Sequence, residues 1–361
     1  MRTGLRIGDY SFMGVPKRRI IPLFIPHYGC KYDCVYCDQR LISGQSVPVT
    51  PEYVRNLCCD LMTAGHKEMN AGSERPPPVP MELAFYGGSF TAIPEKQQIE
   101  LLEAARFFIE SNPLNSIRVS TRPDCIDVPT VARLKSFHVG VIELGAQSMC
   151  GDVLASTRRG HTAVDVELAA DIVKSAGVSL ILQMMTGLPH DTYERSLFTA
   201  RRLIELVPDG VRIYPVVVVR GTALYDMWLR GQYREHSVAE AVELCSELYA
   251  LFDEANIPVI RMGLNPSDSL TKRDAAAGAY HPAFGELVYS KIYYKKAAAL
   301  LEGVPPLSDI SITVSSGNLS KMIGFRRQNI DSLKNGFSLR TLKIAEADIK
   351  PGEIMIEKIS Q

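Results

Sequence analysis

Short apolar runs alternate with longer amphipathic segments between residues 20 and 264, and this alternation constrains the fold more than any other feature. The runs predicted as strands are residues 19–25, 82–86, 116–120, 139–144, 178–184 and 210–219. Several of them are apolar throughout, which is typical of strands buried on both faces of a parallel sheet. Strand–helix units in this succession predict an α/β fold, a partial (β/α)6 parallel barrel, with ligand-binding residues on the loops that follow the strands.

The segments between the runs carry helical periodicity, and the pattern changes after the barrel. Helices are predicted at residues 94–110, 162–176 and 192–206, each after a predicted strand. We expect four parts along the chain: an N-terminal extension (1–18), the barrel (19–265), a helical connector that closes the barrel (266–308) and a small α+β domain (309–361).

Three cysteines, Cys30, Cys34 and Cys37, stand close together after the first predicted strand. Thiolates at this spacing can hold three irons of a 4Fe–4S cubane and leave the fourth iron without a protein ligand. An iron with an open position can bind a substrate, so the motif indicates a reactive cluster. A zinc site is the alternative, with His27 as the fourth ligand, although no second cysteine pair follows. A disulfide is disfavoured in a long chain that lacks a secretory signal.

Polar and glycine-rich motifs fall on the predicted loops after the strands. Gly87 and Gly88, followed by Ser89, let the backbone approach a ligand closely and expose its amides. The other motifs are Arg122-Pro123-Asp124, Glu143-Leu144-Gly145-Ala146-Gln147, Arg159-Gly160-His161-Thr162, Gly187-Leu188-Pro189 and Arg220-Gly221-Thr222.

Together with the C-x-x-x-C-x-x-C spacing, this series resembles the radical S-adenosylmethionine (SAM) superfamily. Over roughly residues 18–265 it is similar to two groups, the catalytic subunit of the Elongator complex and the oxygen-independent coproporphyrinogen III oxidases. The motifs at Arg122, Gly160 and Arg220 are closer to the Elongator group, which modifies the wobble uridine of tRNA. The cysteine spacing is closer to the oxidase group.

The resemblance implies two cofactors and the residues that bind them. Cys30, Cys34 and Cys37 hold the 4Fe–4S cluster, whose open iron binds SAM and whose electron cleaves it to a 5′-deoxyadenosyl radical. The residues implied to contact SAM are Tyr36, Gly87, Gly88, Ser89, Gln147, Arg159, Gly187 and Leu188. No catalytic side chain is identified, and the electron comes from a reductant such as ferredoxin or flavodoxin.

This chain departs from the resemblance in two places. Ser120 stands where both groups usually carry a glutamate, so one polar contact to cofactor or substrate is missing or moved. The acetyltransferase domain of the Elongator subunit is expected to be absent, because too little chain follows the barrel.

The C-terminal part has the order strand, helix, tight loop, helix, strand, which resembles a KH-like module. The signature I-G-x-x-G-x-x-I of that module aligns with Ile323, Gly324, Arg327 and Ile330, so an arginine replaces the second glycine. Because the loop of a KH module clamps a single-stranded nucleic acid, Gly324, Arg326 and Arg327 are RNA-binding candidates. Residues 310–361 hold eight basic and five acidic side chains, and this weak excess keeps a plain packing subdomain as the alternative.

Composition limits the class of protein and its partners. Lys and Arg number 40, as do Asp and Glu, so a nucleic acid would meet a local basic patch rather than a global field. With no apolar run of membrane-spanning length and no signal peptide, we expect a cytoplasmic protein without membrane contact.

These observations predict an oxygen-sensitive radical enzyme that modifies RNA, with tRNA as the first candidate. Two alternatives remain open. One is the same chemistry on a porphyrin-like or other small molecule. The other is a non-catalytic iron–sulfur redox sensor or haem-handling protein.

Overall fold

The structure is a computed structural model that describes residues 8–10, 18–25, 28–44, 47–69, 80–111, 114–264 and 274–359. Within these residues the largest sheet has eight strands in the order β1-β2-β3-β4-β5-β6-β7-β9. The strands are β1 (Gly8–Tyr10), β2 (Arg18–Phe24), β3 (Met81–Tyr86), β4 (Ser116–Thr121), β5 (Val139–Gln147), β6 (Ser179–Thr186), β7 (Gly210–Pro215) and β9 (Val259–Met262). Strands β2 to β7 and β9 are parallel, and β1 pairs antiparallel with β2 at one edge. The expected partial α/β barrel is therefore confirmed, and β9, which falls within one more strand predicted at residues 258–264, adds a seventh parallel strand to the described sheet.

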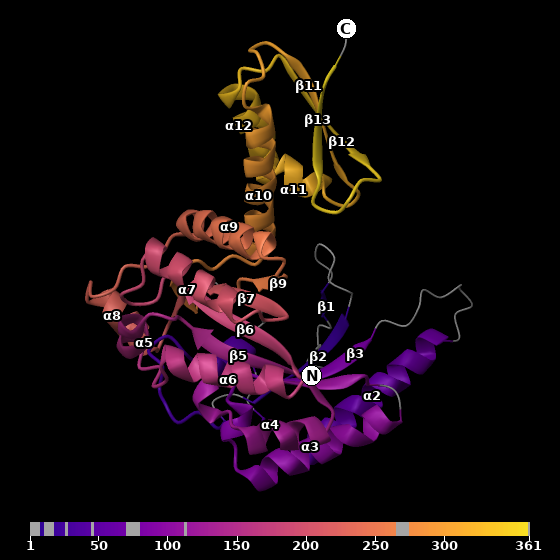
Figure 1. Cartoon of the computed structure of the whole chain (residues 1–361), viewed down its shortest axis with the longest axis vertical. Coiled ribbons are helices and arrows are strands. Elements are labelled where there is room, and N and C mark those ends of the chain that lie inside the picture. Colours follow the sequence, from indigo (N-terminus) through magenta and orange to yellow (C-terminus); the bar gives the residue numbers. More distant parts are fainter. Residues whose placement is uncertain are drawn as a thin grey trace.

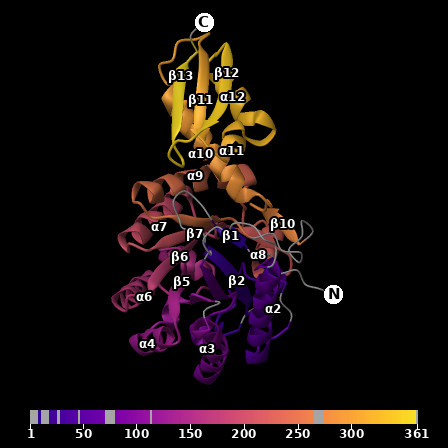
Figure 2. The same ribbon diagram turned by 90° about the vertical axis from the view of Figure 1, so that its right-hand side faces the viewer.

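Helices cover the outer side of this curled sheet, as Figures 1 and 2 show for α2, α3, α4, α6 and α7. The helices of the barrel are α1 (Gln39–Ser43), α2 (Pro51–Met69), α3 (Glu95–Glu110), α4 (Val128–Ser136), α5 (Gly151–Ser156), α6 (Ala163–Ser175), α7 (Tyr193–Glu205), α8 (Ala223–Leu229) and α9 (Val238–Glu254). Capping boxes start α6 at Thr162 and α9 at Ser237. The core between sheet and helices contains Phe85, Ile142 and Leu182, each without exposed surface. No helix in the described ranges combines the length and the apolar character of a bilayer span.

The strand predicted at 210–219 is wrong in its second half. Strand β7 ends at Pro215, and β8 (Val217–Val219) leaves the barrel sheet to pair antiparallel with β10 (Ala275–Gly278). Proline has no N–H for a ladder hydrogen bond, so the parallel pairing ends there. The valines after Pro215 are buried and apolar, so the apolar pattern predicted one continuous strand where the structure has two.

The C-terminal part is attached through α10 (Phe284–Leu301), a continuous helix with two packing partners. Its first half contributes Phe284, Val288 and Ile292 to the barrel core. Its second half contributes Tyr293, Ala297 and Leu301 to a separate core. The connector predicted to close the barrel therefore includes a helix shared between both units, which Figure 1 shows as the link between them.

A small α+β unit follows α10. It contains β11 (Asp309–Ser315), α11 (Leu319–Ile323), α12 (Gln328–Gly336), β12 (Thr341–Ala347) and β13 (Ile354–Lys358). Strand β11 is central, parallel to β12 and antiparallel to β13. The domain limits given above remain predictions. Most of the N-terminal extension and all of residues 265–273 lie outside the described residues.

Candidate active site

The loop that carries the three cysteines packs directly on the glycine-rich loop after β3. A Cβ atom on Gly29 would lie 2.2 Å from the carbonyl oxygen of Ser89, and one on Gly88 would lie 2.3 Å from that of Tyr28. The N–H of Ser89 donates to the carbonyl of Tyr28 at 2.9 Å. Glycine is required on both sides of this contact because no side chain fits between the two backbones.

The cysteine thiols differ in exposure and share a partly cationic surrounding. Cys30 is exposed, Cys37 is half-buried and Cys34 is buried, where its sulfur accepts a long hydrogen bond of 3.6 Å from Arg159. Burial raises the pKa of Cys37 to about 12, although the amide of Gln39 donates to its sulfur at 3.2 Å. Burial also raises the pKa of Cys30. Thiols in this setting need a nearby cation, such as a metal, to become thiolates at neutral pH.

Among the described residues, no three His, Cys, Asp or Glu side chains converge as ligands of a single ion. In a cubane each thiolate binds a different iron, so its ligands need not converge on one point. His27, the fourth ligand in the alternative of a zinc site, lies outside the described residues.

Arg159 and Gln147, both predicted to contact SAM, lie together at the carboxyl end of β5. The register shifts between Gly145 and Gln147, which places Gln147 in the left-handed region at φ 63°. Arg159 donates to the carbonyl of Gly145 at 2.8 Å, while Oε1 of Gln147 and Nε of Arg159 are buried without a hydrogen-bond partner in the described structure. Unsatisfied polar atoms at a strand end suit a polar ligand that would complete their hydrogen bonds.

Gly187 and Leu188 lie at the end of β6, where they meet the loop between α8 and α9. Leu188 belongs to the same apolar cluster as Cys34 and Tyr36. Tyr233 donates a 2.5 Å hydrogen bond to the carbonyl of Gly187. A Cβ atom on Gly187 would lie 3.0 Å from Nδ1 of His236, so a side chain in this turn would displace the His236 ring.

Comparisons with known proteins agree with this arrangement. A family model described as the Radical SAM superfamily matches residues 24–203, and one described as the Radical_SAM C-terminal domain matches residues 208–294. This chain belongs to the radical SAM superfamily. It is a radical SAM enzyme.

Individual relatives cover only part of the chain. Elongator complex protein 3 of Danio rerio is 30% identical over 191 residues, which are 47% of this chain and 35% of that protein. The tRNA uridine(34) acetyltransferase of Methanocaldococcus jannaschii is 32% identical over 131 residues, 36% of this chain and 24% of that protein. The chain thus matches well under half the length of these curated relatives.

One solved structure has a similar fold. The archaeal Methanocaldococcus infernus Elp3 with an N-terminal deletion superimposes with a TM-score of 0.58 and 22% identity, over 79% of this chain and 64% of that one. The likeness supports the partial-barrel architecture. It covers more of this chain than the segments that match the two curated relatives.

Radical SAM enzymes use a 4Fe–4S cluster and S-adenosylmethionine, which supply the radical chemistry when bound. The residues of this chain fit both groups. Cys30, Cys34 and Cys37 are free thiols on one loop, in the position for a cluster. The unpartnered Nε of Arg159, whose guanidinium contacts Cys34, can donate to an oxygen of SAM, and the unpartnered Oε1 of Gln147 can accept from a hydroxyl.

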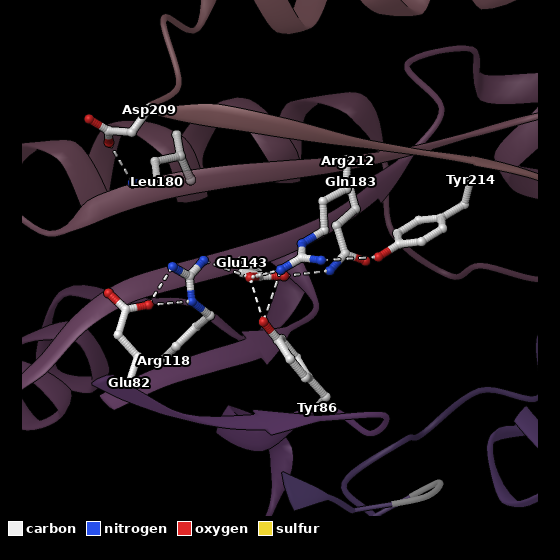
Figure 3. Close-up of polar contacts among 9 residues, drawn as sticks. All are labelled: Glu82, Tyr86, Arg118, Glu143, Leu180, Gln183, Asp209, Arg212 and Tyr214. Atoms are coloured by element: carbon white, nitrogen blue, oxygen red, sulfur yellow. Dashed lines mark hydrogen bonds and ion pairs between the residues drawn. The ribbon is translucent and has the colours of Figure 1, made fainter. Parts of the chain in front are cut away.

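A layer of buried charges that the sequence motifs did not predict crosses the inside of the barrel (Figure 3). Arg118 binds Glu82 at 2.6 Å and Glu143 at 2.8 Å, and Arg212 binds Glu143 at 2.9 Å. The exposed fraction of each of these four side chains is 6% or less. Burial alone would raise the pKa of Glu143, but the two guanidinium groups hold it at about 2.

Half-buried polar side chains border this layer. Tyr86 and Gln183 both donate to the carboxylate of Glu143, at 3.1 and 3.0 Å, and Arg212 donates to the hydroxyl of Tyr214 at 3.4 Å (Figure 3). Ser120, where the resemblance predicted a glutamate, pairs with Glu143 in the strand register.

The predicted residues form two separate groups. The residues predicted to bind the cluster and SAM lie around the carboxyl ends of β2, β3, β5 and β6. Gly324, Arg326 and Arg327 lie in the C-terminal unit beyond α10 (Figures 1 and 2). The sequence did not predict Tyr233 and His236 as site residues. They reach Gly187 through a tertiary contact of the α8–α9 loop, and no motif in the sequence marks that contact.

Proposed function

We propose that this radical SAM enzyme modifies RNA, with tRNA as the first candidate, and that the C-terminal unit binds the RNA. The observation that carries the proposal is an exposed loop between α11 and α12. Phe325 is 62% exposed there, and the exposed Arg326 has its guanidinium carbon 5.2 Å from the Phe325 ring. Arginine beside an exposed aromatic ring suits a single strand, since arginine binds phosphate and the ring can stack on a base.

The backbone of this loop is held in a fixed form. Gly324 has φ 77°, and a Cβ atom there would lie 2.8 Å from Asn329. The amide of Asn329 donates to the carbonyls of Ser290 and Lys321 at 2.8 and 3.2 Å, which fastens the loop to α10 and α11. Arg326 and Arg327 both have left-handed backbones, at φ 50° and 65°. Non-glycine residues adopt this conformation at a cost, which suits a binding role for the two arginines.

Sequence similarity also supports an RNA substrate. The name of one relative, tRNA uridine(34) acetyltransferase, specifies a tRNA, and that protein is 32% identical over its matched segment. We further propose that the protein works in the cytoplasm, receives its electron from a donor such as ferredoxin or flavodoxin, and loses its cluster in air.

The direct test is SAM cleavage under anaerobic conditions. Protein reconstituted with iron and sulfide is reduced with dithionite and given SAM with and without bulk tRNA, and 5′-deoxyadenosine is quantified. We expect tRNA to raise the rate roughly tenfold, because about 1.4 kcal/mol of remote binding energy used at the reaction centre gives that factor. Product that is indifferent to RNA would instead favour a small-molecule substrate, and no product from cluster-loaded protein would favour a sensor.

The double variant Arg326→Ala/Arg327→Ala tests the loop. We expect weaker binding of a labelled single-stranded oligoribonucleotide in fluorescence anisotropy. The slope of log affinity against log salt should become shallower by about 1.4, because two phosphate contacts on a single strand are lost. The variant Lys343→Ala/Lys350→Ala removes the same charge elsewhere in the C-terminal unit. Equal loss in both variants would contradict a site at the loop.

A further inference from the structure

Tyr32 lies between two of the cluster cysteines and is bracketed by two motifs of the barrel. The guanidinium carbon of Arg122 is 4.6 Å from the centroid of its ring. On Gly160 a Cβ atom would lie 2.5 Å from the ring carbons Cε1 and Cζ. The ring therefore fills the space next to Gly160 and rests on Arg122, while 44% of the residue stays exposed.

Both supports are fixed to the barrel. Arg122 is 3% exposed, binds Asp124 through two hydrogen bonds of 2.8 and 3.1 Å, and donates its backbone N–H to the hydroxyl of Ser89 at 3.3 Å. A guanidinium held this way offers a rigid cationic face to an aromatic ring.

Gly160 is equally constrained. Its φ of 77° favours glycine, and it stands between Arg159, which contacts Cys34, and His161. His161 bonds the carbonyl of Ala146 through Nε2 at 3.1 Å. The segment is thereby fastened to the end of β5 on both sides of Gly160.

We propose that Tyr32 is a positioning residue for the cluster. Its backbone is two residues from both Cys30 and Cys34, so a displaced ring moves both sulfur atoms relative to the barrel. The motifs at Arg122 and Gly160 then have a defined task, which is to dock the cysteine loop. This inference rests on the radical SAM cluster and is independent of the RNA substrate.

Tyr32→Ala and Gly160→Ala test this in the full chain, reconstituted anaerobically. Tyr32→Ala removes the ring, and Gly160→Ala pushes it out of place. For both we expect less iron and sulfide per chain, a shifted midpoint potential, and loss of the change that SAM causes in the electron paramagnetic resonance (EPR) spectrum of the reduced cluster. Tyr32→Phe should restore all three readouts, since it keeps the ring.

Matched controls separate positioning from general damage. Gly303 has φ 78°, and a Cβ atom there would meet no other atom within 4 Å, so Gly303→Ala adds the same backbone strain without the clash. Phe198→Ala removes another exposed ring, at 46% exposure, from α7. Both should keep wild-type spectra. Wild-type iron content, potential and SAM response in Tyr32→Ala would overturn the proposal, as would failure of Tyr32→Phe to restore them; if Gly160→Ala does not fold, the two Tyr32 variants decide.

Discussion

Replacing any one of Cys30, Cys34 or Cys37 by alanine should abolish 5′-deoxyadenosine formation, by more than about a thousandfold, or roughly 4 kcal/mol of barrier. Each variant leaves two thiolates on the loop, too few to hold three irons. Iron and sulfide content, the EPR spectrum of the reduced protein and product formation measure the result. We expect the iron content to fall together with the activity.

Cys125→Ala is the matched control for this prediction. Cys125 is the cysteine outside the motif whose charge influences Cys30, and its own pKa is raised by burial. Because the open iron should have no protein ligand, this variant should keep both iron and activity. Loss of iron in Cys125→Ala would mean a fourth protein ligand and would contradict an iron open to SAM.

The sequence predicted the sheet well because its strands are continuous apolar runs. It did not separate β7 from β8, since the valines after Pro215 are as apolar as the strand before them. It also missed α4 and α5, whose 9 and 6 residues are too few to show a clear helical period. The first failure comes from two strands that share one apolar run, and the second from helices shorter than the pattern needed to recognise them.

The site was predictable to the extent that it is local. The spacing of the cysteines predicts a cluster on this loop, and the motif residue Arg159 does lie beside Cys34. The docking of Tyr32 between Arg122 and Gly160 was not visible, because it joins three loops through tertiary contact. The motifs at Arg122 and Gly160 could be recognised by resemblance. Their contact with the Tyr32 ring can be seen only in the structure.

The buried charges show the same limit. Glu82, Arg118 and Glu143 each interrupt an apolar run, which signals a buried ionic group that needs a partner. Which charges pair depends on the register between strands. For Arg118 and Glu143 that register is set by the pairing of β4 with β5.

Glu143→Gln should lower the free energy of unfolding by about 3–5 kcal/mol, the cost of breaking a buried ion pair from one side. Arg118 and Arg212 both lose a carboxylate partner. The glutamine amide also points an N–H₂ group at some of the hydrogen-bond donors around position 143, and these donors need an acceptor. Urea unfolding of cluster-free protein at pH 7 measures the difference. Glu205→Gln breaks a surface pair with Arg202 and should cost less than about 1 kcal/mol.

The pH dependence of this difference distinguishes a lost charge from lost packing. The folded pKa of Glu143, about 2, lies below its ordinary value of 4.5, so ionised Glu143 stabilises the fold above the ordinary pKa. That contribution is lost as the pH falls from 4.5 through the folded pKa. The gap between wild type and Glu143→Gln should therefore be full at pH 7 and shrink toward pH 2 in the unfolding measurement. A gap that stays constant over this range would mean that Glu143 stabilises the barrel by its shape, and the charged layer would then be a consequence of the fold rather than one of the interactions that hold it.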